Sequence, residues 1–267
     1  MDLLSLPPVA AVLDTASRAL MGLTHLLEPL AGSGAAAAAV VLVTLLVRAA
    51  LVPVGVSQAR AEQTRARLAP RLAELRRRHR HQPEKLQAAT LQLYADEGTT
   101  PFAGCLPVLL QAPVVGVIYA VFVHPRLAGH PNALLGETLA GVPLGSSLAG
   151  VLGGGGASTA TLLVLGAVVA AVAAVGELSR RAARPGGPLA PPAPETGAGT
   201  PAGPLAGPGA QRLLGMLPLT TAVVACVVPL AAGLYLLVTV AWTYVQRRAL
   251  RRRYPLPPAP PARPATD

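Results

Sequence analysis

The sequence has little charge. Asp, Glu, Lys and Arg make up 13% of its 267 residues, about half the share found in a typical soluble domain. Hydrophobic residues make up 52%, and several long apolar runs are present. This composition excludes an ordinary soluble domain and predicts an integral membrane protein. The net charge of +10 comes from arginines concentrated in three blocks, which argues against a soluble nucleic-acid-binding protein.

Cysteine is equally scarce. Cys105 and Cys226 are the only two, and both lie inside apolar runs, so neither a disulfide framework nor a metal-ligand spacing follows from them. His79 and His81 are two residues apart and would point to different faces of a helix. The sequence also lacks a GxxxxGK[ST] phosphate loop and any acid–base or nucleophile constellation. We therefore predict no cofactor, no metal and no enzymatic activity.

One apolar run nevertheless contains a charge. Residues 40–53, VVLVTLLVRAALVP, carry Arg48 well inside a stretch that is otherwise suited to a membrane. An arginine at the centre of a span costs about 2.5–3.5 kcal/mol on insertion scales. Its side chain can extend to the lipid headgroups, or it can face water in a groove. The residues alone leave both interpretations open.

The N-terminal segment predicts an amphipathic helix. Leu13, Ala16, Leu20, Leu23 and Leu27 recur at three- and four-residue spacing and form one apolar stripe. We predict that residues 1–34 form an extracytoplasmic helix lying at the membrane surface. A weakly hydrophobic additional span is the alternative.

Residues 57–100 predict a basic helical hairpin. Pro70 and Pro83 suit the first turns of two helices and Gly98 suits a helix end, so the predicted arms are residues 70–81 and 83–97. Leucines on both arms form a thin predicted seam, which would leave the hairpin mobile: Leu68, Leu72 and Leu75 on one arm, and Leu86, Leu91 and Leu93 on the other.

The fold class predicted is an all-α polytopic membrane protein, a five-span helical bundle with a cytoplasmic helical hairpin. A proposed sixth span at residues 134–152 is rejected because Glu137, Pro143 and a GGGG run interrupt it. The remaining predicted segments are span one (35–56), span two (101–124), an extracytoplasmic loop (125–157), span three (158–178), a Pro/Gly-rich cytoplasmic linker (179–211), span four (212–227), span five (229–246) and a basic disordered cytoplasmic tail (247–267).

The arginine blocks predict the orientation. Positive residues near span ends mark the cytoplasmic side, so residues 57–100, 180–184 and 247–253 should all be inside. Five spans satisfy all three blocks with the N-terminus outside and the C-terminus cytoplasmic. A sixth span would place the second block outside.

Four blocks, in this order, resemble the YidC/Oxa/Alb family of membrane protein insertases: LVTLLVRAALVP, LAPRLAELRRRHR, PFAGCLPVLLQAPVVGVIY and PLAAGLYLLVTVAWTYVQRR. They cover most of the chain outside residues 1–34 and 124–210. Two positions depart from the family pattern: Thr100 replaces the usual asparagine, and Leu236 stands where an aromatic residue is common.

The resemblance implies an insertase of the bacterial cell membrane that works without nucleotide through a hydrophilic groove open to cytoplasm and lipid. Arg48 would attract acidic residues of the substrate, and Thr44, Gln111 and Tyr119 either line the same groove or bond to neighbouring helices. The hairpin would be a mobile lid, or simply a topology determinant lying on anionic lipid.

The resemblance also implies partners. These are nascent membrane proteins, membrane lipid and, as candidates, the Sec translocon and the ribosome. The ribosome contact would use the basic tail, Arg247, Arg248, Arg251, Arg252 and Arg253. A small-solute transporter or channel is the competing function, but it calls for paired ionisable residues in mid-membrane, and the other predicted spans contain none.

Overall fold

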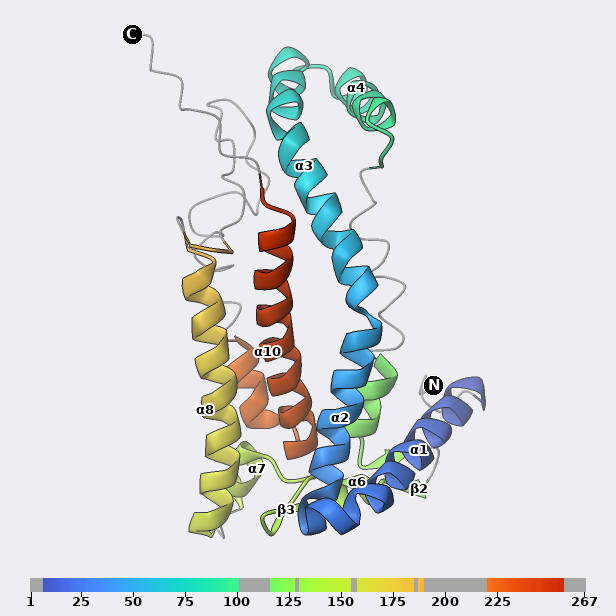
Figure 1. Cartoon of the computed structure of the whole chain (residues 1–267), viewed down its shortest axis with the longest axis vertical. Coiled ribbons are helices and arrows are strands. Elements are labelled where there is room, and N and C mark those ends of the chain that lie inside the picture. Colours follow the sequence, from blue (N-terminus) through green and yellow to red (C-terminus); the bar gives the residue numbers. More distant parts are fainter. Residues whose placement is uncertain are drawn as a thin grey trace. The chain divides into compact units, whose positions relative to one another are not determined.

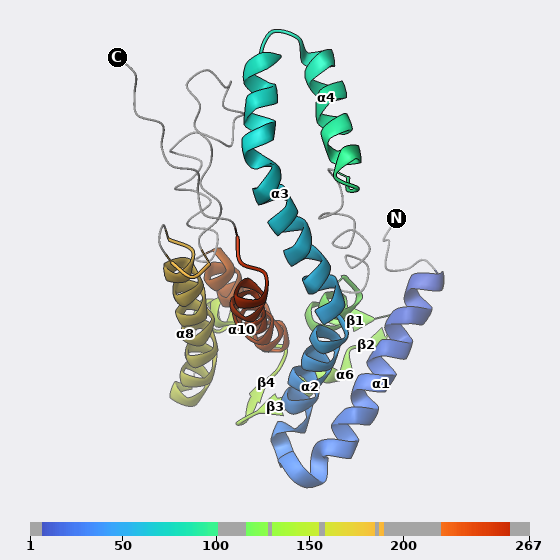
Figure 2. The same ribbon diagram turned by 45° about the horizontal axis from the view of Figure 1, so that its top comes forward.

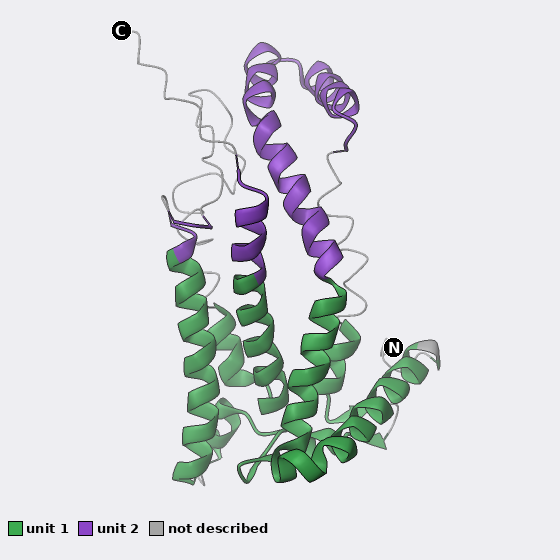
Figure 3. Cartoon of the chain, in the orientation of Figure 1, with its two compact units in different colours: residues 1–51, 111–181, 215–245 green, residues 52–110, 182–214, 246–267 purple. Residues whose placement is uncertain are grey.

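The computed structural model describes residues 7–100, 116–127, 130–154, 158–184, 187–189 and 220–256. Most of these residues are helical (Figure 1). The chain divides into two compact units (Figure 3). Unit 1 comprises Met1–Leu51, Gln111–Arg181 and Gly215–Val245, and unit 2 comprises Val52–Leu110, Ala182–Leu214 and Gln246–Asp267. Predicted residue Gln111 and most of the predicted linker lie outside the described residues.

Unit 1 is built on helices. They are α1 (Pro7–Ala31), the short 3-10 helix η2 (Gly32–Gly34), α2 (Ala35–Ala50), two helical segments at residues 116–123 and 220–227, α8 (Thr159–Ala182) and the first part of α10 (Leu230–Arg253). Two helical stretches in the described chain are long and apolar enough to cross a membrane, Val9–Ala50 and Thr159–Ala182.

The predicted stripe of α1 is the face that packs. Leu13 and Leu20 are buried, and Ala16, Leu23 and Leu27 pack against the same hydrophobic cluster. The chain then turns back at η2, so that α1 and α2 form a helical pair (Figure 2). The periodicity of the leucines therefore identified the buried side of α1 correctly.

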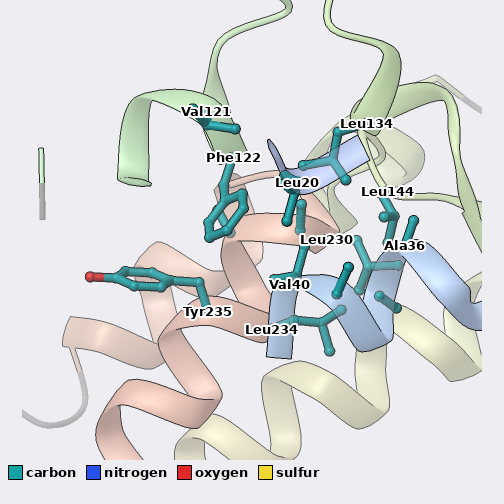
Figure 4. Close-up of a cluster of buried hydrophobic side chains, with 14 of the residues drawn as sticks. Leu20, Ala36, Val40, Val121, Phe122, Leu134, Leu144, Leu230, Leu234 and Tyr235 are labelled. Carbon is teal, nitrogen blue, oxygen red and sulfur yellow. The ribbon is translucent and has the colours of Figure 1, made fainter. Parts of the chain in front are cut away.

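The core of unit 1 joins α2, α10 and the helical segment at residues 116–123 (Figure 4). Small residues of α2, including Ala36 and Ala39, are fully buried and allow neighbouring side chains to approach its backbone. The rings of Phe122 and Tyr235 pack with centroids 5.8 Å apart and planes inclined by 53°, a tilted arrangement that aromatic pairs favour.

The described residues between 124 and 154 form no long helix. It consists of two small antiparallel pairs and two short helices: β1 (Arg126–Leu127) with β2 (His130–Pro131), β3 (Thr138–Leu139) with β4 (Val142–Pro143), α6 (Ala133–Gly136) and α7 (Leu148–Gly153). These short elements agree with the interpretation of residues 134–152 as a loop, and the number of spans stays a prediction. Leu134, Val142 and Leu144 are nevertheless buried in the core of unit 1.

Backbone hydrogen bonds attach this segment to α10. The amides of Leu230 and Ala231 donate to the carbonyls of Ser146 and Leu144 at 2.8 and 3.0 Å. The first amides of a helix have no partner within the helix, so the segment satisfies two donors that would otherwise need water. This attachment fixes the start of α10 against the segment.

Unit 2 contains α3 (Val52–Arg78) and α4 (Pro83–Asp96), the two arms of a helical hairpin. The prediction that Pro70 begins a helix is wrong, because α3 runs through it. The helix begins instead at Val52, with Pro53 in its first turn, where a missing N–H costs nothing. The first predicted span, 35–56, is therefore interrupted at Leu51, between α2 and α3.

The start and end of α4 follow the prediction. Pro83 occupies its first turn. At its end Gly98 has φ +64°, and the amides of Gly98 and Thr99 donate to the carbonyls of Ala95 and Tyr94, both at 2.9 Å. This is a Schellman ending, in which glycine takes the left-handed position.

The seam of the hairpin differs from the prediction at one residue. Leu68 is buried, but Leu91 is 50% exposed and Tyr94 is buried in its place. Leu86, Thr90 and Tyr94 follow one another at four-residue spacing, which puts them on one face of α4, whereas Leu91 lies off that face. Glu97 then closes the open end of the hairpin by pairing with Arg67 at 2.7 Å and Arg71 at 2.8 Å.

The prediction of a disordered tail from residue 247 is wrong for residues 247–253, which continue α10. Residues 257–267 lie outside the described part.

Within unit 2 the end of the chain docks on α3 through contacts that we call the C-terminal clasp. Arg251 pairs with Glu62 at 2.9 Å, Arg60 lies 5.5 Å from the ring centroid of Tyr254, and Gln63 Nε2 donates to the carbonyl of Pro255 at 2.9 Å.

Arg251 and Glu62 of the C-terminal clasp should be energetically coupled. The Arg251 side chain is 16% exposed and that of Glu62 is 38% exposed, so the pair lies between a buried and a surface ion pair. We expect a double-mutant cycle with Arg251→Ala and Glu62→Ala to give a coupling energy of about 1 kcal/mol. The measurement is the free energy of unfolding in detergent. Arg252→Ala, at an exposed neighbour, is the matched control, and additive losses at 251 and 62 would contradict the prediction.

Candidate functional site

The candidate site lies on one face of α2 in unit 1. Val40, Thr44 and Arg48 are spaced four residues apart, so they stack on the same side of the helix. Val40 and Thr44 are fully buried, whereas Arg48 is partly exposed. This face therefore leaves the hydrophobic core within two turns and ends at a charged side chain.

Arg48 has no carboxylate partner among the residues that the structure describes. In unit 1, Asp14 pairs with Arg18 at 3.0 Å. Glu28 lies 3.7 Å from His25, and Glu177 pairs with both Arg180 and Arg181 at the end of α8. The remaining described carboxylate of unit 1, Glu137, forms no described ion pair. The positive charge of Arg48 is thus left without a fixed counter-ion in the described part of the unit.

The hydroxyl of Thr44 is already bonded. It donates to the carbonyl of Val40 at 2.7 Å, within its own helix. A hydroxyl used in this way keeps only acceptor capacity for another molecule. Thr44 thus adjoins Arg48, as the shared face predicts, but it offers no free donor.

Tyr119 lies on a different helical segment. It is partly buried and packs against the hydrophobic cluster, three residues before Phe122. No hydrogen bond between Tyr119 and Arg48 is found in the described part of the chain. The structure therefore brings Arg48 and Thr44 together on α2, leaves Tyr119 against the core, and does not describe Gln111.

A residue that the sequence did not single out packs in the same cluster as the buried part of this face. Tyr235, on α10, lies in the hydrophobic cluster that contains Val40 of α2. Its ring is buried against Phe122, and its hydroxyl points away from the labelled apolar side chains (Figure 4). The available signal was the spacing of Tyr235, Thr239 and Thr243, three hydroxyl-bearing residues four apart in an apolar run.

This arrangement suits the binding of a ligand rather than the making or breaking of covalent bonds. A partly exposed guanidinium one helical turn from a hydroxyl can bind a carboxylate or a backbone carbonyl. In the described part of the chain, no group of three or more His, Cys, Asp or Glu residues is placed to hold a metal ion. The helical fold, with two helices of membrane-spanning length in the described part of the chain, is consistent with the class of α-helical membrane proteins.

The chain belongs to the family described as 60Kd inner membrane protein, whose model matches residues 27–257. The family resemblance of the four sequence blocks is thereby confirmed. Relatives named membrane protein insertase YidC share local similarity with the chain. The protein of Clostridium perfringens is 38% identical over 81 residues, and that of Helicobacter pylori is 41% identical over 83 residues. The protein of Burkholderia multivorans is 38% identical over 94 residues.

These alignments cover segments of both partners. They include 30% of this chain and 34% of the Clostridium perfringens protein, and 31% of this chain and 15% of the Helicobacter pylori protein. For the Burkholderia multivorans protein the shares are 35% and 17%. The match therefore spans about a third or less of each of these relatives.

Proposed function

We propose that this protein is a membrane protein insertase that transfers segments of nascent membrane proteins from the cytoplasm into the lipid bilayer without nucleotide. The observation that carries the proposal is Arg48, an arginine on an apolar helix without a described carboxylate partner. A buried charge normally acquires a fixed partner. A visiting acidic segment of a substrate would supply that partner only while it is bound.

The surroundings of Arg48 support a groove. On the core side the α2 face is closed by Val40 and Thr44, both fully buried. On the other side Arg48 is partly exposed. Water that reaches a charge from one side lowers its burial cost, while a closed apolar end prevents a continuous pore. The polar segment of a substrate would enter part-way, and its apolar segment would then move into lipid.

The proposed topology has five spans, with the N-terminus outside and the C-terminus in the cytoplasm of a bacterial cell. The helices α8 and α10 overlap the third and fifth of these spans, and the helical residues 116–123 and 220–227 overlap the second and fourth. Arginines lie in the last turns of both α8 and α10, which supports this orientation.

The basic hairpin is proposed as the cytoplasmic part that receives substrate. Arg76, Arg77 and Arg78 are exposed at the end of α3 and suit anionic lipid or an acidic partner. Contact with the ribosome or the Sec translocon is proposed for the exposed C-terminal arginines, which are Arg247, Arg248, Arg252 and Arg253. Arg251 is engaged with Glu62 instead.

Reconstitution tests the proposal. Proteoliposomes containing the purified protein and empty liposomes of the same lipid would receive a single-span substrate with a short acidic translocated tail. We expect a protease-protected tail only in the proteoliposomes. Equal protection in both preparations would overturn the insertase function. Passage of ions or small solutes without substrate insertion would instead favour the transporter or channel.

A further inference from the structure

One hydroxyl in α10 departs from a pattern that four other helical threonines share. Thr24, Thr44, Thr90 and Thr243 each donate to the carbonyl four residues earlier, at 2.7 to 3.1 Å. The Oγ1 atom of Thr239 is buried and has no hydrogen-bond partner among the residues that the structure describes. A threonine in a helix can donate to such a carbonyl of its own helix, and Thr239 does not.

Thr239 lies in the part of unit 1 that contains the candidate site. It is one turn beyond Tyr235, on the same face of α10, and Tyr235 belongs to the same hydrophobic cluster as Val40 of α2. Val40 of α2 and Leu234 of α10 pack at the same level (Figure 4), and both helices run in the same direction from there (Figure 1). At 1.5 Å per residue, Thr239 lies about 7 Å and Arg48 about 12 Å beyond that level.

The geometry points to Thr239 as a second substrate-contact residue, which hydrogen-bonds the backbone of the translocating segment beside Arg48. The inference rests on the proposed insertase function and deepens it. Arg48 distinguishes acidic side chains, because only a negative group gains from its charge. Thr239 offers a neutral donor and acceptor, so it suits the peptide groups that every substrate carries.

The physical need for such a contact is general. An extended segment that enters a helical bundle carries backbone N–H and C=O groups with no partner in the same chain. In an apolar setting each unpaired group is costly, and a hydroxyl without a partner has the same need. Bringing the two together satisfies both, and the contact exists only while the substrate passes.

The test uses the full-length protein in the proteoliposomes described above, with two single-span substrates whose short translocated tails are acidic or uncharged. Thr239→Val removes the hydroxyl at nearly constant volume. We expect it to slow insertion of both substrates by about three- to tenfold, the effect of losing one neutral hydrogen bond, and to leave the unfolding temperature equal to or above that of the wild type. Thr239→Ser should restore the rate. Thr243→Val is the matched control, because its hydroxyl is bonded within the helix.

The outcomes separate the inference from the proposed function. Insertion by Thr239→Val at the wild-type rate would overturn the inference alone, as would equal losses in Thr239→Val and Thr239→Ser, which would indicate packing instead of hydrogen bonding. A loss confined to the acidic tail would also overturn it, because that dependence belongs to a charge. No insertion by the wild type would overturn the proposed function and this inference with it.

Discussion

Arg48→Ala is expected to lower the insertion rate of a substrate with an acidic translocated tail at least tenfold. Two opposite charges 4 Å apart interact by about 4 kcal/mol at an intermediate dielectric, before desolvation is subtracted. A tenfold loss needs only about 1.4 kcal/mol of that to remain. Because Arg48 has no described carboxylate partner in unit 1, its removal leaves no buried anion behind. The measurement is the rate at which the tail becomes protected from protease in proteoliposomes.

The controls separate charge from packing. Arg48→Lys keeps the charge but loses the planar fork, so we expect a smaller loss than for alanine. Arg18→Ala removes an exposed arginine of the same unit, whose ion pair with Asp14 is on the surface, and should behave as the wild type. A substrate with an uncharged tail should be affected less than the acidic one. If alanine and lysine at position 48 both supported wild-type insertion, Arg48 would be a residue that simply extends to the headgroups.

Periodicity was the reliable guide to the fold. The leucine spacing in α1 identified its buried face, since Leu13 and Leu20 are in the core. Gly98 and Pro83 marked the ends of α4 correctly, because each acts through its own backbone geometry. Such signals are local and need no knowledge of the rest of the chain.

The prediction failed at two places, one decided by neighbouring helix formers and the other by a long-range contact. Pro70 was assigned to a helix start, yet the flanking Ala, Arg and Leu residues favour a helix strongly enough to continue through it. Residues 247–253, at the end of α10, fall in the basic, proline-rich tail that the sequence predicts to be disordered. Its arginine-rich turn is instead helical and docks on α3, and the partners Arg251 and Glu62 are far apart in the sequence. Neither local segment contains a sequence signal that predicts this ion pair.

The candidate site was predicted in part. An arginine in an apolar run is visible in any sequence, and the structure places Arg48 at the edge of the α2 core face. Thr44 adjoins it because both lie on one helical face. The packing of Tyr235 of α10 in the same cluster as Val40 of α2 could not be predicted, since it depends on how helices pack. Apolar runs reveal helices but not which of their faces meet.

Asn132→Leu is expected to lower the free energy of unfolding by about 3 kcal/mol. The Asn132 side chain is buried, and its Nδ2 donates to the carbonyls of Val121 at 2.7 Å and His124 at 3.0 Å. Its Oδ1 accepts from the amide of Leu134 at 3.2 Å, which caps α6. Leucine fills a similar volume but leaves three backbone groups unpaired, and each buried unpaired group costs about 1–3 kcal/mol. Denaturation in detergent would measure the loss.

Ser147→Ala provides the matched control. Ser147 also caps a short helix of this segment, accepting from the amide of Gly150 at 3.1 Å, but it makes no second bond of the kind that Asn132 makes through Nδ2. Its loss should cost about 1 kcal/mol, the usual value for a cap. The difference between the two variants therefore measures the bonds that tie the end of the 116–123 helix to the loop after it. Equal losses would show that capping alone accounts for Asn132. A loss near 3 kcal/mol would establish this asparagine as the residue that holds the short elements of the segment against the core of unit 1, where Leu134 and Leu144 are buried.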